Sequence, residues 1–145
     1  MQHILAIDYG LKRTGLAFAE KPLYIAHPLE TIPSNNLSSY IEKYIVDYAV
    51  DTIVIGLPKK LNNTQTDATS HVNTFKNKLS KKHPQIEMVY FDERFSSTLA
   101  KKALVEGNFK KSARRKKENV DVIAATIILQ DYLKSIENNL NQKRK

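Results

Sequence analysis

Apolar and polar positions divide the chain into short apolar runs and longer periodic stretches. The first apolar run, residues 3–7, stops at Asp8, and a second, residues 15–19, follows a basic turn. Two such runs separated by a glycine-containing turn predict a β-hairpin. Residues 25–32 form a third extended piece, in which Pro28 favours an edge strand because proline donates no ladder hydrogen bond.

Helical and strand patterns then alternate. Apolar residues recur at helical spacing over about residues 37–50, and packing alone explains this stripe, so its tyrosines are interpreted as core rather than as base-stacking groups. Residues 52–56 are continuously apolar, which is typical of a strand buried on both faces of a parallel sheet. A second helical face spans residues 68–79, and another strand covers residues 86–91.

Two further helices are predicted in the last third of the chain. The first begins at Ser96 or Ser97, either of which can cap it, and ends at Gly107. The second runs from about Asn119 to Leu140, and its first half is apolar nearly all round, which predicts burial.

This order of elements predicts the fold class. A strand hairpin with a third strand, followed by alternating helices and strands, indicates an α/β domain whose mixed five-stranded sheet is covered by helices on both faces. Residues 1–137 are interpreted as one domain, and residues 138–145 as a polar, basic C-terminal tail that we expect to be mobile.

Composition narrows the classes of function. A chain of 145 residues suits a single domain. It has no cysteine, which excludes disulfides, thiolate metal sites and a cysteine nucleophile, and fits a reducing compartment. No apolar run reaches the roughly 18 residues that a membrane-spanning helix needs. We therefore expect a cytoplasmic protein that does not enter a membrane.

The chain is strongly basic. Lysine and arginine number 23 against 15 acidic residues, a formal net charge of +8. This excess favours a polyanionic partner such as nucleic acid, although basic composition alone also fits an ordinary soluble protein. The positions of the cations are more informative. Six of them lie within eight positions before the last helix: Lys110, Lys111, Arg114, Arg115, Lys116 and Lys117.

Three acidic residues occupy unusual places. Asp8 ends an apolar strand, Glu93 follows a different strand, and Asp121 shares an inward helical face with apolar neighbours. An ionised carboxylate on an inward face needs a partner or a metal, and a divalent ion satisfies all three together. Oxygen ligands without cysteine suit Mg²⁺ or Mn²⁺, and two such ions roughly 4 Å apart promote phosphodiester hydrolysis.

Simpler explanations exist for each acid. Asp8 suits a turn, Asp121 suits a helix N-terminus, and Glu93 can pair with neighbouring Arg94. The basic residues Lys12 and Arg13 follow Asp8 and are candidates for holding a phosphate, as are Arg94 and the run at residues 110–117, with ordinary surface charge as the alternative.

Four sequence motifs, in order across nearly the whole chain, resemble the YqgF (RuvX) family. They are Ile7-Asp8-Tyr9-Gly10-Leu11-Lys12-Arg13-Thr14-Gly15, then Ile55-Gly56-Leu57-Pro58, then Asp92-Glu93-Arg94-Phe95-Ser96-Ser97, and Val120-Asp121 followed by Ala124-Ala125 and Ile128-Leu129-Gln130. The resemblance implies an RNase H-like fold related to the RuvC Holliday-junction resolvases. It also implies metal-dependent maturation of the 5′ end of the 16S rRNA precursor, with Asp8, Glu93 and Asp121 at the family's acidic positions.

The chain departs from the family pattern after Leu57-Pro58, where residues 59–64 replace the usual glycine-containing turn. Substrate contact by that loop is therefore not expected from the resemblance. Two other functions remain open: a Holliday-junction resolvase, which needs two active sites and hence a homodimer rather than a monomer, and a non-catalytic module that binds nucleic acid or a ribosome precursor particle. No residue pattern suggests readout of base edges, so specificity would come from the shape of the nucleic acid or from such a partner.

Overall fold

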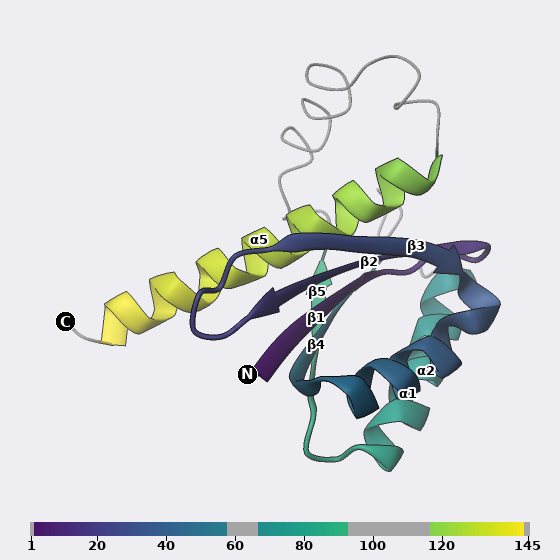
Figure 1. The fold of residues 1–145 in the computed structure, drawn as a ribbon, viewed down its shortest axis with the longest axis horizontal. Coiled ribbons are helices and arrows are strands. Elements are labelled where there is room, and N and C mark those ends of the chain that lie inside the picture. Colours follow the sequence, from purple (N-terminus) through teal and green to yellow (C-terminus); the bar gives the residue numbers. More distant parts are fainter. Residues whose placement is uncertain (1, 58–66, 93–116, 144–145) are drawn as a thin grey trace.

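The computed structural model describes residues 2–57, 67–92 and 117–143, which form one sheet and the helices packed on it (Figure 1). The elements in chain order are β1 (Gln2–Asp8), β2 (Arg13–Glu20), β3 (His27–Pro33), the 3-10 helix η1 (Ser34–Asn36), α1 (Leu37–Asp47), β4 (Ala49–Leu57), α2 (Asp67–Lys82), β5 (Glu87–Asp92) and α5 (Lys117–Lys143). The helix predicted from Ser96 or Ser97 to Gly107 lies outside the described residues.

The sheet has five strands in the order β3-β2-β1-β4-β5. β1 pairs antiparallel with β2 and parallel with β4, and β4 pairs parallel with β5. The predicted mixed sheet and hairpin are therefore confirmed. β3 is an edge strand, as Pro28 predicted, and the register between β2 and β3 shifts between Leu16 and Ala17, where Ala17 pairs with Pro28.

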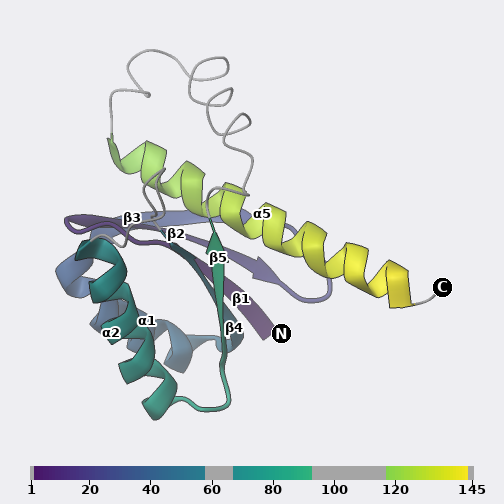
Figure 2. The same ribbon diagram turned by 180° about the vertical axis from the view of Figure 1, so that it is seen from behind.

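Alternation along β1 separates two cores. Leu5 and Ile7 join the core under α1 and α2, whereas Ile4 and Ala6 join the core under α5. Successive side chains of a strand point to opposite faces, so a strand with apolar residues at every position is buried on both sides. Figure 2 shows α5 on one face of the sheet and α1 and α2 on the other, which confirms the expected helices on both faces.

The N-terminal half of α5 packs closely on β2 and β1. Ala125, Ile128 and Leu129 of the helix meet Ala17 and Ala19 of β2 in one apolar cluster. Small side chains on both surfaces bring the helix axis close to the sheet, and the predicted burial of this half is confirmed for Ala124, Ala125 and residues 127–129.

Three details differ from the sequence expectations. α1 ends at Asp47, because Tyr48 adopts an extended conformation (φ −133°, ψ 144°) and β4 begins at Ala49. Tyr48 is 47% exposed, whereas Tyr44 of the same stripe is buried. α5 continues to Lys143, past the predicted helix end at about Leu140 and into the segment interpreted as a tail. No helix among the described residues is both long and apolar enough to cross a membrane.

Candidate functional site

Asp8 is the last residue of β1 and is half-buried. Alternation from Ile4 and Ala6, which pack under α5, places position 8 on the same face of the sheet. The neighbouring Tyr9 packs against the opposite core, and burial raises the pKa of its hydroxyl above the ordinary value, so Tyr9 adds no charge near neutral pH. At the end of β1, Asp8 is thus the acidic residue on the face of the sheet that α5 covers.

Glycines flank Asp8 on both sides of the sheet. Asp8 pairs with Gly15 of β2 and with Gly56 of β4. The same level of the sheet continues to Thr31 of β3 and Phe91 of β5. Residues paired across strands share a face, and their Cβ atoms are about 5 Å apart where both have one. The residues on either side of Asp8 in the two adjacent strands therefore have no side chain next to its carboxylate.

The ends of three parallel strands meet at the edge that holds Asp8. Gly56 of β4 pairs with Asp8, and the next residue, Leu57, pairs with Asp92 of β5. Neighbouring strands are about 4.8 Å apart, so the end of β5 is about 10 Å from Asp8. Glu93 follows Asp92 directly in the chain and lies outside the described residues, so its convergence with Asp8 stays a prediction.

α5 brings position 121 toward the same end of the sheet. Tyr132 of α5 interacts electrostatically with Lys21 and Asp51, which lie at the end of the sheet where β1 begins. Going back eleven residues along the helix covers about 16 Å, and β1 spans about 20 Å from Gln2 to Asp8. Ala125, one helical turn after position 121, packs in the same cluster as Ala6, two residues before Asp8. The Asp121 side chain lies outside the described ones, so its convergence with Asp8 stays a prediction.

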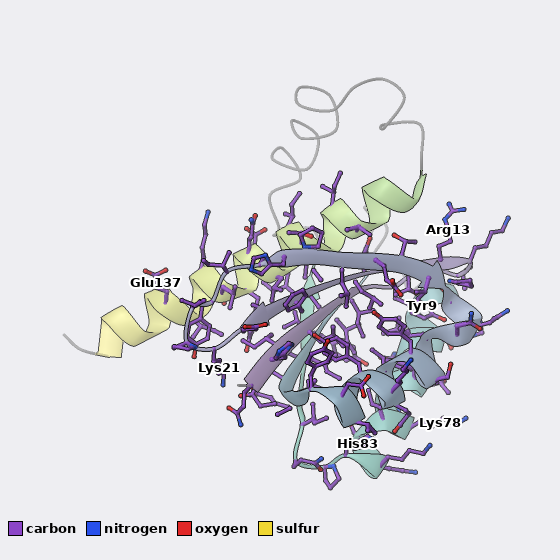
Figure 3. The ribbon with its side chains drawn as sticks, in the orientation of Figure 1. Tyr9, Arg13, Lys21, Lys78, His83 and Glu137 are labelled. Atoms are coloured by element: carbon purple, nitrogen blue, oxygen red, sulfur yellow. The ribbon has the colours of Figure 1, made fainter. Side chains whose placement is uncertain are left out.

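The predicted phosphate-binding residues are placed in part. Lys12 is exposed in the β1–β2 turn, and Arg13, which begins β2, is half-buried. Figure 3 shows Arg13 and Tyr9 at one end of the sheet and Lys21 at the other. Lys117 is the first residue of α5, without a described side chain. Outside the described residues lie Arg94, Lys110, Lys111, Arg114, Arg115 and Lys116.

The carboxylate of Asp8 is the kind of donor that Mg²⁺ and Mn²⁺ prefer, because both are hard cations with oxygen ligands. Within residues 2–57, 67–92 and 117–143, no three histidine, cysteine, aspartate or glutamate side chains form a metal-binding group. Of the predicted ligands, only Asp8 has a described side chain. It fits a divalent cation in donor type, and the residues paired with it on both adjacent strands, Gly15 and Gly56, have no side chain.

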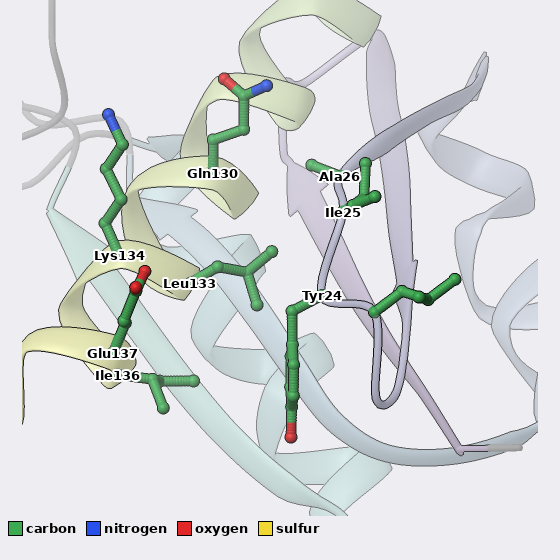
Figure 4. Close-up of a pocket in the computed structure, with 9 residues that line it drawn as sticks. Tyr24, Ile25, Ala26, Gln130, Leu133, Lys134, Ile136 and Glu137 are labelled. Carbon is green, nitrogen blue, oxygen red and sulfur yellow. The ribbon is translucent and has the colours of Figure 1, made fainter. Parts of the chain in front are cut away.

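A pocket of about 640 Å³ lies between the β2–β3 connection and the C-terminal half of α5 (Figure 4). Its lining is largely apolar and includes Tyr24, Ile25, Leu133 and Ile136. It is near Lys21, at the opposite end of the sheet from Asp8, and among its lining residues Glu137 is the single acid. This pocket is therefore separate from the candidate metal site.

Three residues of this region could not be placed from the sequence. Gly15 and Gly56 belong to the family motifs, but their position beside Asp8 follows only from the strand register. The side chain of Ser34, just before α1, suits a helix cap by residue type, but its hydroxyl donates to the carbonyl of Gly10, 24 residues earlier. The helix begins after Asn36, which makes no side-chain capping bond. A contact between residues so far apart leaves no periodic signal in the sequence.

Comparison with known proteins identifies the family of the chain. The family model described as "RuvX: Holliday junction resolvase" matches residues 2–135. A protein of Phocaeicola vulgatus named "Putative pre-16S rRNA nuclease" is 45% identical over 135 residues, 93% of this chain and 97% of that protein. A protein of Bacteroides thetaiotaomicron with the same name is 43% identical, over 93% of this chain and 98% of its own length.

The fold resembles a solved structure of RuvC. T. thermophilus RuvC in complex with a Holliday junction substrate superimposes with a TM-score of 0.54 and 10% identity, covering 88% of this chain and 92% of RuvC. At that identity the likeness shows the RNase H-like fold alone. The family match and the curated relatives span nearly the whole sequence. The chain therefore belongs to the RuvX family.

Proposed function

We propose that this chain is a divalent-metal-dependent nuclease that hydrolyses phosphodiester bonds in maturing the 5′ end of the 16S rRNA precursor in the cytoplasm. The observation that carries the proposal is the placement of Asp8 at the end of β1, on the α5 face and between two glycines, in a family whose curated relatives bear the name of this activity. A non-catalytic binding module has no need of a carboxylate facing a polyanion.

The proposed metal ligands are Asp8, Glu93 and Asp121. Phe91 packs on the α5 face, and alternation makes position 93, two residues later, the next to face α5 if the strand conformation continues. This supports Glu93 over Asp92. Ala125 and Ile128 of α5 pack on the sheet, and Asp121 precedes them by one and two helical turns. Mg²⁺ or Mn²⁺ held by these residues would supply charge stabilisation for the attacking and leaving oxygens.

The chain's own residues have separable roles in this proposal. The three carboxylates hold the ions, and Lys12, Arg13, Arg94 and the basic run at residues 110–117 contact the phosphate backbone. Contacts of this type fix the position of the nucleic acid without reading its sequence. Specificity then comes from RNA shape or from a ribosome precursor particle as partner.

A Holliday-junction resolvase is the second candidate, favoured by the description of the family model and by the fold of RuvC. Resolution of a four-way junction requires paired active sites, and therefore a homodimer, whereas RNA trimming is compatible with a monomer. Light scattering of the purified chain separates the two requirements.

The deciding experiment compares cleavage of a structured rRNA precursor fragment and of four-way DNA by the same preparation, with Mg²⁺ and with Mn²⁺. We expect metal-dependent cleavage of the RNA, and its loss in Asp8→Asn, Glu93→Gln and Asp121→Asn but not in Asp92→Asn. Preferential cleavage of the junction would favour the resolvase. No cleavage of either substrate, with binding retained, would leave the binding module as the function. Loss of cleavage in Asp92→Asn with full activity in Glu93→Gln would reverse that ligand assignment.

A further inference from the structure

The turn between β1 and β2, residues 9–12, is hydrogen-bonded to Ser34, the first residue of η1, which precedes α1. The Ser34 hydroxyl donates to the carbonyl oxygen of Gly10 at 2.5 Å, and the Ser34 backbone N–H donates to the carbonyl oxygen of Lys12 at 3.0 Å. Two carbonyl groups of the turn that follows Asp8 therefore accept hydrogen bonds from Ser34, the residue that directly follows β3.

A third residue completes this contact. Thr14 Oγ1 lies 2.8 Å from Ser34 Oγ, and Thr14 is fully buried. A carbonyl oxygen only accepts, so the single hydroxyl proton of Ser34 goes to Gly10. Thr14 must then donate its proton to Ser34. The result is a directed chain of hydrogen bonds from Thr14 through Ser34 to Gly10, in which each hydroxyl has a defined orientation.

The turn is also closed on itself. A Cβ atom added to Gly10 would lie 2.5 Å from the carbonyl oxygen of Arg13, closer than such atoms approach in real structures. Only glycine permits this close approach of the two backbone segments. The conformation between Gly10 and Arg13 is thus held internally by contact and externally by Ser34.

We propose that Ser34 is a positioning residue for phosphate binding: it holds the Gly10–Arg13 backbone so that Lys12 and Arg13 meet the nucleic-acid backbone beside Asp8. The proposal rests on the nuclease function proposed above. Lys12 is exposed in this turn, and its long side chain loses conformational freedom when it contacts a phosphate. A backbone that is already fixed reduces the entropy cost of binding and keeps Lys12 and Arg13 within reach of phosphate, so loss of Ser34 should lower both the affinity and the number of phosphate contacts.

The test is a salt titration of binding to an RNA hairpin in Ca²⁺, used as a non-catalytic ion, followed by fluorescence anisotropy. Ser34→Ala should weaken binding roughly threefold to tenfold, the equivalent of ordering one more long side chain. The slope of log affinity against log salt should fall by up to about 0.7 for each single-strand phosphate that the variant no longer binds. Ser34→Thr keeps the hydroxyl and should restore both values. Ser39→Ala is the matched control, because Ser39 also donates to a nearby carbonyl, that of Asn36, at 3.0 Å.

A double-mutant cycle with Lys12→Gln shows whether Ser34 acts through the turn. If it does, Ser34→Ala should weaken binding much less in the Lys12→Gln background than in the wild type, because the side chain that it positions is already absent. Thr14→Val removes only the donor to Ser34 and provides a milder second variant should Ser34→Ala fold poorly. We expect an intermediate reduction of affinity from it.

An unchanged affinity and salt slope in Ser34→Ala, with only a lower melting temperature, would show that Ser34 is a structural tie and would overturn the proposal. Full additivity with Lys12→Gln would do the same. Failure of the wild-type chain to bind any nucleic acid is a different result, since it contradicts the proposed function itself and this inference with it.

Discussion

Asp8 of β1 and Gly56 of β4 lie side by side at the same level of two parallel strands. The position next to the proposed metal-binding carboxylate therefore carries no side chain, and Gly15 repeats the arrangement on the other side of Asp8. Adding a methyl group at either glycine brings an apolar atom to about 5 Å from the Asp8 Cβ, where ions and their water ligands would lie.

Gly56→Ala should therefore weaken Mn²⁺ binding and reduce cleavage by at least about tenfold, close to 1.4 kcal/mol in transition-state stabilisation. Isothermal titration calorimetry with Mn²⁺ and initial rates on the same RNA substrate measure the two effects. The competing explanation is that Gly56 is needed only for helix packing on the sheet. That explanation requires a large fall in the melting temperature of the metal-free protein, with metal affinity per folded molecule unchanged.

Asp8→Asn should lower the cleavage rate about a hundredfold or more, because removal of a ligand takes away several kcal/mol of stabilisation by the ions. The metal-free melting temperature should change little, since Asp8 is half-buried and the amide has the same shape. Asp47→Asn is the control: Asp47 is exposed at the end of α1, on the other face of the sheet. Equal activity of Asp8→Asn and Asp47→Asn would show that Asp8 is not a metal ligand in catalysis.

The basic run predicts a change in salt dependence. Replacing Arg114, Arg115, Lys116 and Lys117 with glutamine should flatten the slope of log affinity against log salt by about two units or more, if most of the four contact phosphate. Binding of unrelated sequences should weaken similarly, because backbone contacts carry no base information. Catalysis at saturating substrate should change much less.

A matched control removes the same charge elsewhere. α2 lies on the face of the sheet opposite α5, and the residues to replace there with glutamine are Lys76, Lys78, Lys81 and Lys82. Equal flattening in both quadruple variants would indicate a general effect of net charge, and an unchanged slope in the first would make the run an ordinary solvated surface.

Alkaline pH should destabilise the fold through its buried tyrosines. Burial raises the pKa of Tyr40 to about 12 and raises the pKa of Tyr44 as well. A group whose pKa is higher in the folded state contributes stability that is complete below the unfolded pKa, about 10 for tyrosine, and is lost as pH rises through the folded pKa. The free energy of unfolding should therefore stay level from neutral pH to about pH 10 and fall above it.

Tyr44→Phe separates this effect from others. The variant loses the hydrogen bond of 2.7 Å between Tyr44 and His3 Nδ1, so it should be less stable at neutral pH by about 1 kcal/mol. Its alkaline decline should be shallower, because one titrating hydroxyl is gone. Urea unfolding at several pH values provides the measurement, with the exposed Tyr24→Phe as control. An identical decline in Tyr44→Phe and the wild type would contradict the assignment.

The strands were predictable because their signal is local. The apolar runs around Ile4 and Ile55 need neighbours on both faces, and this alone implies central strands of a covered sheet. The end of α1 was missed because Tyr48 continues the helical spacing while its backbone is already extended. Periodicity records which residues are apolar, and it does not record where the backbone leaves the helix.

The acidic residues of the candidate site could be proposed from the sequence, but the residues that surround them in the structure could not. Asp8 is conspicuous because a carboxylate ends an apolar strand, and its motif matches the family. The role of Gly56 depends on strand register, and that of Ser34 depends on a contact across 24 residues. Both follow from how segments distant in sequence are aligned, and no local pattern of residues encodes that alignment.

The position of β3 as an edge strand affects how the protein can self-associate. Two of its seven residues, Pro28 and Pro33, have no backbone N–H, and Glu30 adds a charge between them. A border of this composition is a poor template for an incoming strand from another molecule. Any homodimer is therefore expected to form through side-chain surfaces and not by extending the sheet across this border, which also protects the protein from strand-mediated aggregation at high concentration.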